Sequence, residues 1–166
     1  MAGVAVDGSN ITEVKKTGHV TYISQRYEVV QYGACNSWDP ITGMCNGWDP
    51  DEYDWVTKGS HSTDAKITGT VSCSSKIKVN GTSVAKVGDT VNFTWVADPP
   101  VPSDAYPWRY RNVSPATSGS GTGVITGGSV KGKLGGQSIA LIGSEVEVLG
   151  VTTTVADGNT KINFSS

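Results

Sequence analysis

A twelve-residue unit occurs twice in the chain and constrains its fold more than any other feature. The first copy, Lys78–Asp89, reads KVNGTSVAKVGD, and the second, Lys133–Ser144, reads KLGGQSIALIGS without a gap. Each copy contains an Asn-Gly or Gly-Gly step, which forms tight β-hairpin turns because both residues tolerate positive φ. A third, partial copy, 158–164, resembles the strand Ser74–Val79 that precedes the first turn. Short hairpins cannot each bury a face alone, so we predict that they stack around one core in a single domain, 1–166.

The composition predicts an all-β fold. The chain has 21 glycines, abundant Val and Thr, and leucine only at positions 134, 141 and 149. Val and Thr favour strands, and glycine disfavours helices. No segment has the three-and-four spacing of an amphipathic helix. The first thirty residues are expected to form short strands, with turns at Gly8-Ser9-Asn10 and Thr17-Gly18.

Two segments interrupt the repeats and are expected to be long loop insertions, at about 33–58 and 97–122. In the first, a CN-x-WDP unit occurs twice, at Cys35–Pro40 and Cys45–Pro50. Asp-Pro and Asn-Gly steps favour turns over a regular element. The second segment is rich in proline and ends in the Gly-Ser run 118–123, which indicates an extended surface loop.

The three cysteines, Cys35, Cys45 and Cys73, make an odd number, which is unusual for a disulfide framework. We expect buried free thiols, with a Cys35–Cys45 pair as the alternative. For Trp38, Trp48 and Trp55 we expect a miniature core inside the first insertion, with a surface contact for glycans or a membrane as the alternative. The acidic residues of this segment are expected to form solvated turns.

Charge and motifs exclude several classes of function. The net charge of −2 argues against a nucleic-acid binder, which needs a basic face. No apolar run is long enough to span a membrane, and the N-terminus does not resemble a signal peptide. We therefore expect folding in a cytoplasm. No nucleophile motif, carboxylate pair or phosphate loop is recognisable, which predicts a protein that is not an enzyme.

The repeats resemble those of the PAAR-repeat proteins. The resemblance rests on ITG-TVSCSSKIKVNG-TSVAKVGD, with Ser83-Val84-Ala85-Lys86 and Ser138-Ile139-Ala140-Leu141 at the place of the Pro-Ala-Ala-Arg tetrapeptide. It covers roughly residues 59–96 and 123–164. It implies a small conical β-structure that docks on a trimeric β-helical spike. The strands and turns that would carry this structure are Gly81, Val84, Ala85, Val87, Gly88, Asp89, Gly136, Ile139, Ala140 and Gly143.

The resemblance also implies one zinc or iron ion near the point, held by histidines and a cysteine. His19, His61 and Cys73 are the residues that would match. The segments after the turns Gly88-Asp89 and Gly143-Ser144 are Thr90–Phe93 and Glu145–Val148, and they contain no His or Cys. A metal site and plain burial of His19, His61 and Cys73 therefore both stay open.

The function expected from these observations is mechanical. One cap would close a trimeric spike of a contractile phage tail and sharpen it for piercing, with transient contact with the target membrane. It would be part of the virion and would be assembled in the host cytoplasm. A phage particle is favoured over a secretion system because no toxin segment follows the repeats. The alternatives are a type VI-like tip that recruits effectors and, from another class, a carbohydrate-binding β-module that uses the aromatic residues of 35–55.

Overall fold

The computed structural model describes residues 2–164, and the all-β prediction is confirmed. These residues form fifteen strands and no helix. The strands are β1 Ala2–Val4, β2 Val14–Gln31, β3 Cys35–Trp38, β4 Cys45–Trp48, β5 Glu52–Ser72, β6 Lys78–Val79, β7 Thr82–Ser83, β8 Thr90–Asp98, β9 Trp108–Ser114, β10 Ser118–Ile125, β11 Lys133–Leu134, β12 Gln137–Ser138, β13 Glu145–Val148, β14 Val151–Thr154 and β15 Asn159–Phe164. Within this part of the chain no helix is long and apolar enough to cross a membrane.

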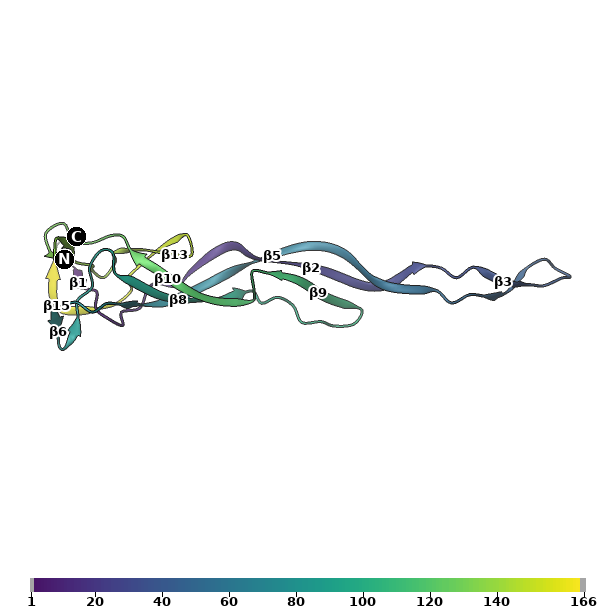
Figure 1. The fold of residues 1–166 in the computed structure, drawn as a ribbon, viewed down its shortest axis with the longest axis horizontal. Coiled ribbons are helices and arrows are strands. Elements are labelled where there is room, and N and C mark those ends of the chain that lie inside the picture. The colour runs from purple at the N-terminus through teal and green to yellow at the C-terminus, as the bar shows by residue number, and fades with distance from the viewer. Residues whose placement is uncertain (1, 165–166) are drawn as a thin grey trace.

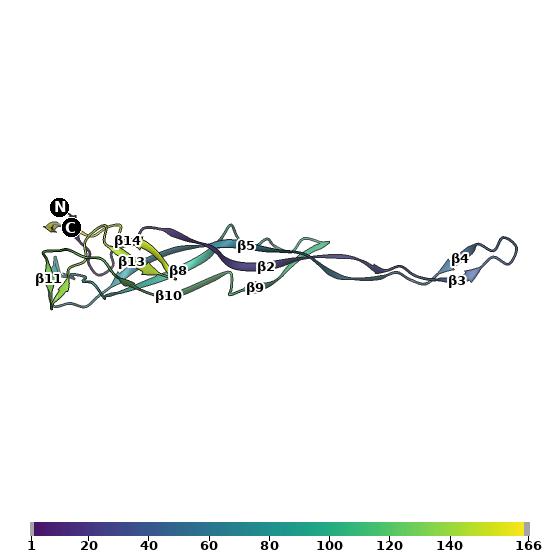
Figure 2. The same cartoon turned by 90° about the horizontal axis from the view of Figure 1, so that it is seen from above.

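The molecule is elongated, and its two ends differ. One end contains both termini and the short strands β1, β6 and β15 (Figure 1), together with β11 (Figure 2). The opposite end is the β3–β4 hairpin. Between them runs an antiparallel seven-stranded sheet in the order β14-β13-β10-β8-β5-β2-β9. The sheet is curled, which brings its two edges together: the Thr12 amide just before β2 donates a hydrogen bond to the Thr154 carbonyl of β14 at 2.8 Å.

The longest feature is the pair β2 and β5, which with β3 and β4 forms a projection that we call the long arm (14–72). The two strands pair from Val14↔Ile67 to Gln31↔Glu52. The turn predicted at Thr17-Gly18 is instead an irregularity inside β2, where the register shifts and Gly18 has a φ of +66°. The predicted loop 33–58 is also wrong in part, because it contains β3, β4 and the first residues of β5. Its two Asp-Pro steps directly follow β3 and β4.

The second predicted insertion, 97–122, also contains strands. Its prolines lie outside them: β9 begins after Pro107 and ends before Pro115. The Gly-Ser run forms β10, and its glycines are required by the neighbouring strand β8. A Cβ on Gly119 would lie 2.6 Å from Trp95 Nε1, and one on Gly121 would lie 2.8 Å from Phe93 Cζ. Small residues on β10 therefore make room for two aromatic rings. The Gly-Ser run is thus an ordered strand whose glycines are explained by packing, and not the predicted loop.

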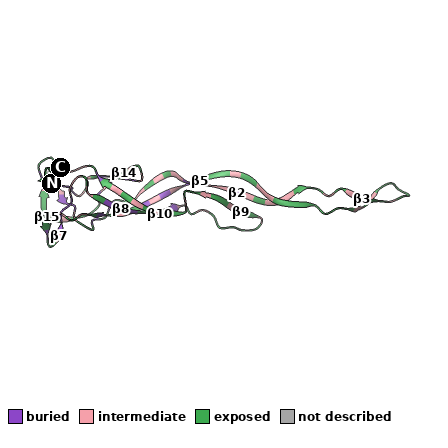
Figure 3. Cartoon of the chain, in the orientation of Figure 1, coloured by how far each residue is buried: buried purple, intermediate pink, exposed green. Residues whose placement is uncertain are grey.

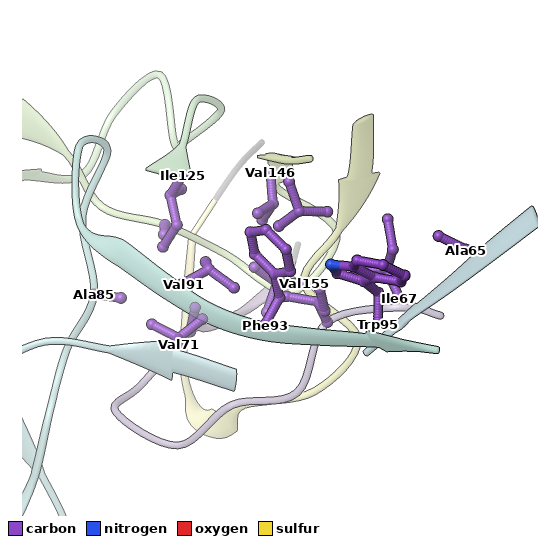
Figure 4. Close-up of a cluster of buried hydrophobic side chains, with 14 of the residues drawn as sticks. Ala65, Ile67, Val71, Ala85, Val91, Phe93, Trp95, Ile125, Val146 and Val155 are labelled. Atoms are coloured by element: carbon purple, nitrogen blue, oxygen red, sulfur yellow. The ribbon is translucent and has the colours of Figure 1, made fainter. Parts of the chain in front are cut away.

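The hydrophobic core lies in the half of the molecule near the termini. It includes Val71, Val91, Phe93, Ile125 and Val146, which converge from the strands β5, β8, β10 and β13 (Figure 4). Along the long arm, burial stops at Ser24 on β2 and Thr63 on β5, and residues 25–62 are all half-buried or exposed (Figure 3). The arm beyond these residues is therefore held by strand pairing and surface contacts.

Candidate functional site: the three-repeat end

The two sequence repeats adopt the same local structure. Strands β6 and β7 are joined by Asn80-Gly81, with φ of 53° and 79°. Strands β11 and β12 are joined by Gly135-Gly136, with φ of 60° and 83°. Positive φ at both turn positions is the reason for the Asn-Gly and Gly-Gly steps in the sequence. Both hairpins lie at the end of the molecule that carries the termini.

A third hairpin is formed by the two ends of the chain. Strand β15 pairs with β1, with Phe164 opposite Ala2 and Asn163 opposite Gly3. The register matches the first copy, in which Val79 lies opposite Thr82 and Lys78 opposite Ser83. The partial copy 158–164 is thus the first strand of a complete repeat. Its second half is VAVDGS, residues 4–9, which the sequence analysis missed. The signal was present, since VAVDGS, VAKVGD and IALIGS share Ala and Gly at the same spacing.

The three copies close into a ring of backbone hydrogen bonds. The Ala5 amide donates to the Ala140 carbonyl, the Ala140 amide to Ala85, and the Ala85 amide to Ala5, each at 2.9 Å. All three alanines are 0% exposed. A second set repeats the pattern, from Asp7 N to Ser83 O, Val87 N to Ser138 O and Ile142 N to Gly3 O, at 2.8–2.9 Å. The three-repeat end, which we define as 2–9, 76–89, 131–144 and 159–164, therefore has pseudo-threefold symmetry.

The turn that ends each repeat is also the same in all three copies. Gly8, Gly88 and Gly143 have φ of 86°, 94° and 95°. The next residue accepts a hydrogen bond from the backbone N–H three positions earlier: Val6 N to Ser9 Oγ at 3.0 Å, Lys86 N to Asp89 Oδ2 at 2.9 Å, and Leu141 N to Ser144 Oγ at 2.8 Å. A serine hydroxyl thus replaces the aspartate carboxylate without changing the turn.

The residues predicted to carry the repeats lie at this end. They fall into three groups: buried residues that directly follow β7 and β12, exposed glycines with positive φ, and half-buried turn residues. The buried ones are Val84, Ala85, Ile139 and Ala140, the glycines are Gly81, Gly88, Gly136 and Gly143, and Val87 and Asp89 are half-buried in the turn.

The proposed metal ligands do not form a site. Within residues 2–164 no group of three His, Cys, Asp or Glu side chains could hold a metal ion. His61 Nε2 is 2.9 Å from Ser24 Oγ, and its ring stacks on Tyr22. His19 lies edge-on against Trp95, its Nε2 is buried without a hydrogen-bond partner among the described residues, and burial lowers its pKa.

Cys73 also belongs to no group of three candidate ligand side chains among the described residues. Its thiol donates to the Ser83 carbonyl at 3.5 Å, and burial raises its pKa to about 11. The ligand set implied by the resemblance therefore does not fit an ion in this structure.

The tip of the long arm corrects two predictions. Cys35 and Cys45 form a disulfide, which had been the alternative to free thiols, and Cys73 alone is free among the described residues. Trp38 and Trp48 do not form a miniature core: they are 62% and 65% exposed. Antiparallel pairing of β3 with β4 sets each tryptophan opposite a cysteine of the other CN-x-WDP unit. The duplicated unit thus forms a small stapled hairpin with its indoles in solvent.

The acidic residues of the tip satisfy backbone donors, as the sequence indicated. Asp39 Oδ1 accepts from the Ile41 amide at 2.7 Å, and Asp51 Oδ1 accepts from the Gly33 amide at 2.7 Å. The hydrogen bonds that Asp39 accepts from backbone amides lower its pKa. Residues 29–57 contain five acidic side chains and no Lys or Arg, so the tip is negatively charged.

An aromatic surface lies on the part of the long arm where β9 pairs with β2 and β2 pairs with β5, which we call the shaft. Trp55 belongs to it: the ring is 5.2 Å from that of Tyr27, and Arg109 Cζ lies 4.3 Å from its centroid. Nearby, an open pocket of about 330 Å³ is lined by Tyr22, Ser24, His61, Pro102, Trp108 and Tyr110.

A comparison of the chain with family models, with curated proteins and with solved structures found no match. A proposal of function therefore rests on the geometry of the three-repeat end and of the long arm.

Proposed function

We propose that this protein is a structural, non-enzymatic cap that seats its three-repeat end on the trimeric central spike of a phage-type contractile tail. A PAAR-repeat protein would act in this way. The observation that carries the proposal is the closed hydrogen-bond ring of Ala5, Ala85 and Ala140. A trimer presents three identical surfaces around its axis, and a monomer can contact all three equally only if it repeats its own surface three times.

The long arm would then project from the spike toward the target envelope. Both views place the β3–β4 tip at the end of the molecule opposite the three-repeat end (Figures 1 and 2). The disulfide of the tip supports its exposure outside the cytoplasm, since such bonds persist in oxidising surroundings. We propose assembly in the host cytoplasm and a final position at the tail tip of the virion. A type VI-like tip with the same docking geometry is the alternative within this class.

The test is stoichiometric binding to a trimeric spike. Native mass spectrometry of the chain mixed with the β-helical spike trimer of the same particle should give one cap per trimer. A matched control lacks the distal arm: Asn-Gly replaces residues 25–58, so that Ser24 and Gly59, which pair in the sheet, are joined by a two-residue turn. Because burial stops at Ser24, this variant should fold and bind equally well. Three caps per trimer, or no complex, would exclude the cap.

A second candidate function is glycan binding by the shaft. The pocket between Tyr22, Trp108 and Tyr110 combines aromatic walls with the hydrogen-bonding pair Ser24 and His61, and sugar sites need both features. Glycan-array binding that is lost in Trp108→Ala and retained in Trp38→Ala would support it. A flat array profile for the intact chain would remove it.

A further inference from the structure

Lysines occupy threefold-equivalent positions on the three-repeat end. The strand registers make Lys78, Lys133 and Asn163 equivalent, because they lie opposite Ser83, Ser138 and Gly3. Two residues before these positions in the chain are Lys76, Lys131 and Lys161. Five of these six positions are therefore lysine, and the earlier of the two positions is lysine in all three copies.

These lysines are exposed and free of ionic partners. All five are solvent-exposed, and none forms an ion pair with a described residue. The segments 76–83, 131–138 and 161–164 contain no Asp or Glu. Lys133 and Lys161 make only side-chain hydrogen bonds to neutral groups, Ser138 Oγ and Asn80 Oδ1. Like charges grouped in this way repel each other, so the cluster does not stabilise the isolated fold.

In two of the three repeats an exposed apolar side chain directly follows the first lysine. Ile77 and Ile162 are equivalent by register and are 51% and 40% exposed. The third position is Gly132. Exposed apolar residues between charged ones are typical of a protein-binding surface, because the apolar part gives affinity and the charges select the partner.

We propose that the three-repeat end binds an acidic partner: the apex of the trimeric spike presents a carboxylate cluster from each of its three chains to the lysines of one repeat. This inference rests on the proposed cap function and adds the chemistry of the docking surface. Threefold placement of the lysines favours a trimeric protein over a lipid surface or a nucleic acid, since neither of those has threefold symmetry. The negative tip, by the same logic, does not compete for this acidic surface.

The test compares two triple variants with the same change of net charge. Lys76→Gln/Lys131→Gln/Lys161→Gln removes the equivalent lysines, whereas Lys15→Gln/Lys58→Gln/Lys66→Gln removes three lysines of the long arm. We expect the first to raise the Kd for the spike trimer by roughly ten-fold or more, from three charge pairs of up to about five-fold each. The control should change it less than about two-fold. The Lys→Arg version of the first variant should restore binding, and circular dichroism checks that all variants fold.

The outcomes separate this inference from the cap function. One cap per trimer with equal affinity for wild type and the Lys→Gln variant would leave the cap standing and overturn the acidic docking surface. No complex with any trimer would overturn both. Lysine-dependent binding to vesicles containing phosphatidylserine, or to duplex DNA, at an affinity equal to that for the trimer would also overturn the inference. A salt dependence that is strong for wild type and weak for the Lys→Gln variant would support it.

Discussion

The disulfide at the tip of the long arm should stabilise the tip alone and leave the body unchanged. Cys35 and Cys45 are separated by 10 residues. Closing a loop of this length restricts the unfolded chain by roughly 2.5–3 kcal/mol at 25 °C. A two-stranded hairpin is at best marginally stable without other support. The bond therefore contributes most of the stability of the β3–β4 hairpin.

The structure indicates why the loss stays local. Residues 25–62 include no buried side chain, so the tip shares no core with the rest of the molecule. Local opening of the tip then costs far less than global unfolding. The double variant Cys35→Ser/Cys45→Ser should open at the tip while the core strands remain closed.

Native-state hydrogen exchange measures this directly. The amides of Asp39 and Asp49, which donate to the carbonyls of Met44 and Ala34 at 2.8 Å, should exchange up to about 100-fold faster in the variant. The amides of Val91 and Val146 in the core should not change. Unchanged exchange at Asp39 and Asp49 would refute the role of the disulfide. Faster exchange at all four amides would refute the independence of the arm.

Three further predictions concern packing, turns and the free thiol. Gly119→Ala should lower the free energy of unfolding by about 1–3 kcal/mol, because its Cβ would overlap the Trp95 ring, whereas its exposed neighbour Ser120→Ala should cost less than about 0.5 kcal/mol in urea denaturation. The equivalent turn glycines Gly8, Gly88 and Gly143 have positive φ and open space around the Cβ position. Substitution of each by Ala should lower the free energy of unfolding by about 1–2 kcal/mol, equal among the three to within about 0.5 kcal/mol. One outlier would contradict the equivalence of the repeats. Alkylation of Cys73 by iodoacetamide should be slow at pH 8 and rise with a midpoint near pH 11, and a native rate at pH 8 equal to that in denaturant would argue against its raised pKa.

The sequence predicts the parts of the fold that local chemistry determines. Asn80-Gly81 and Gly135-Gly136 identify two hairpins because positive φ at two successive positions has few other causes. The third hairpin was predicted only by half, since its strands come from opposite ends of the chain. No turn sequence joins β15 to β1, so only the similarity of VAVDGS to the other copies could have identified it.

The errors have a common physical origin in contacts between distant strands. The Gly-Ser run 118–123 reads as a flexible loop, because the Trp95 and Phe93 rings that require its glycines belong to another strand. Likewise, Cys35 and Cys45 are too few for a disulfide pattern, yet antiparallel pairing of two identical units brings them together. The metal site stays a prediction from the resemblance: His19, His61 and Cys73 match a pattern along the chain, and in the structure their side chains contact different neighbours.

The symmetry of the three-repeat end and the asymmetry of the long arm are compatible within one chain. Three hairpins leave the ring at equivalent buried positions, Ile11, Val91 and Val146, and run away from it. The third turns back after four residues, at Leu149-Gly150, whereas the first continues to the disulfide tip. The ring fixes only the first residues of each hairpin, so their lengths can differ without disturbing the threefold surface. A single long arm on a pseudo-threefold base is the geometry that the proposed cap function requires, since one cap seated on a trimeric spike would give it one point.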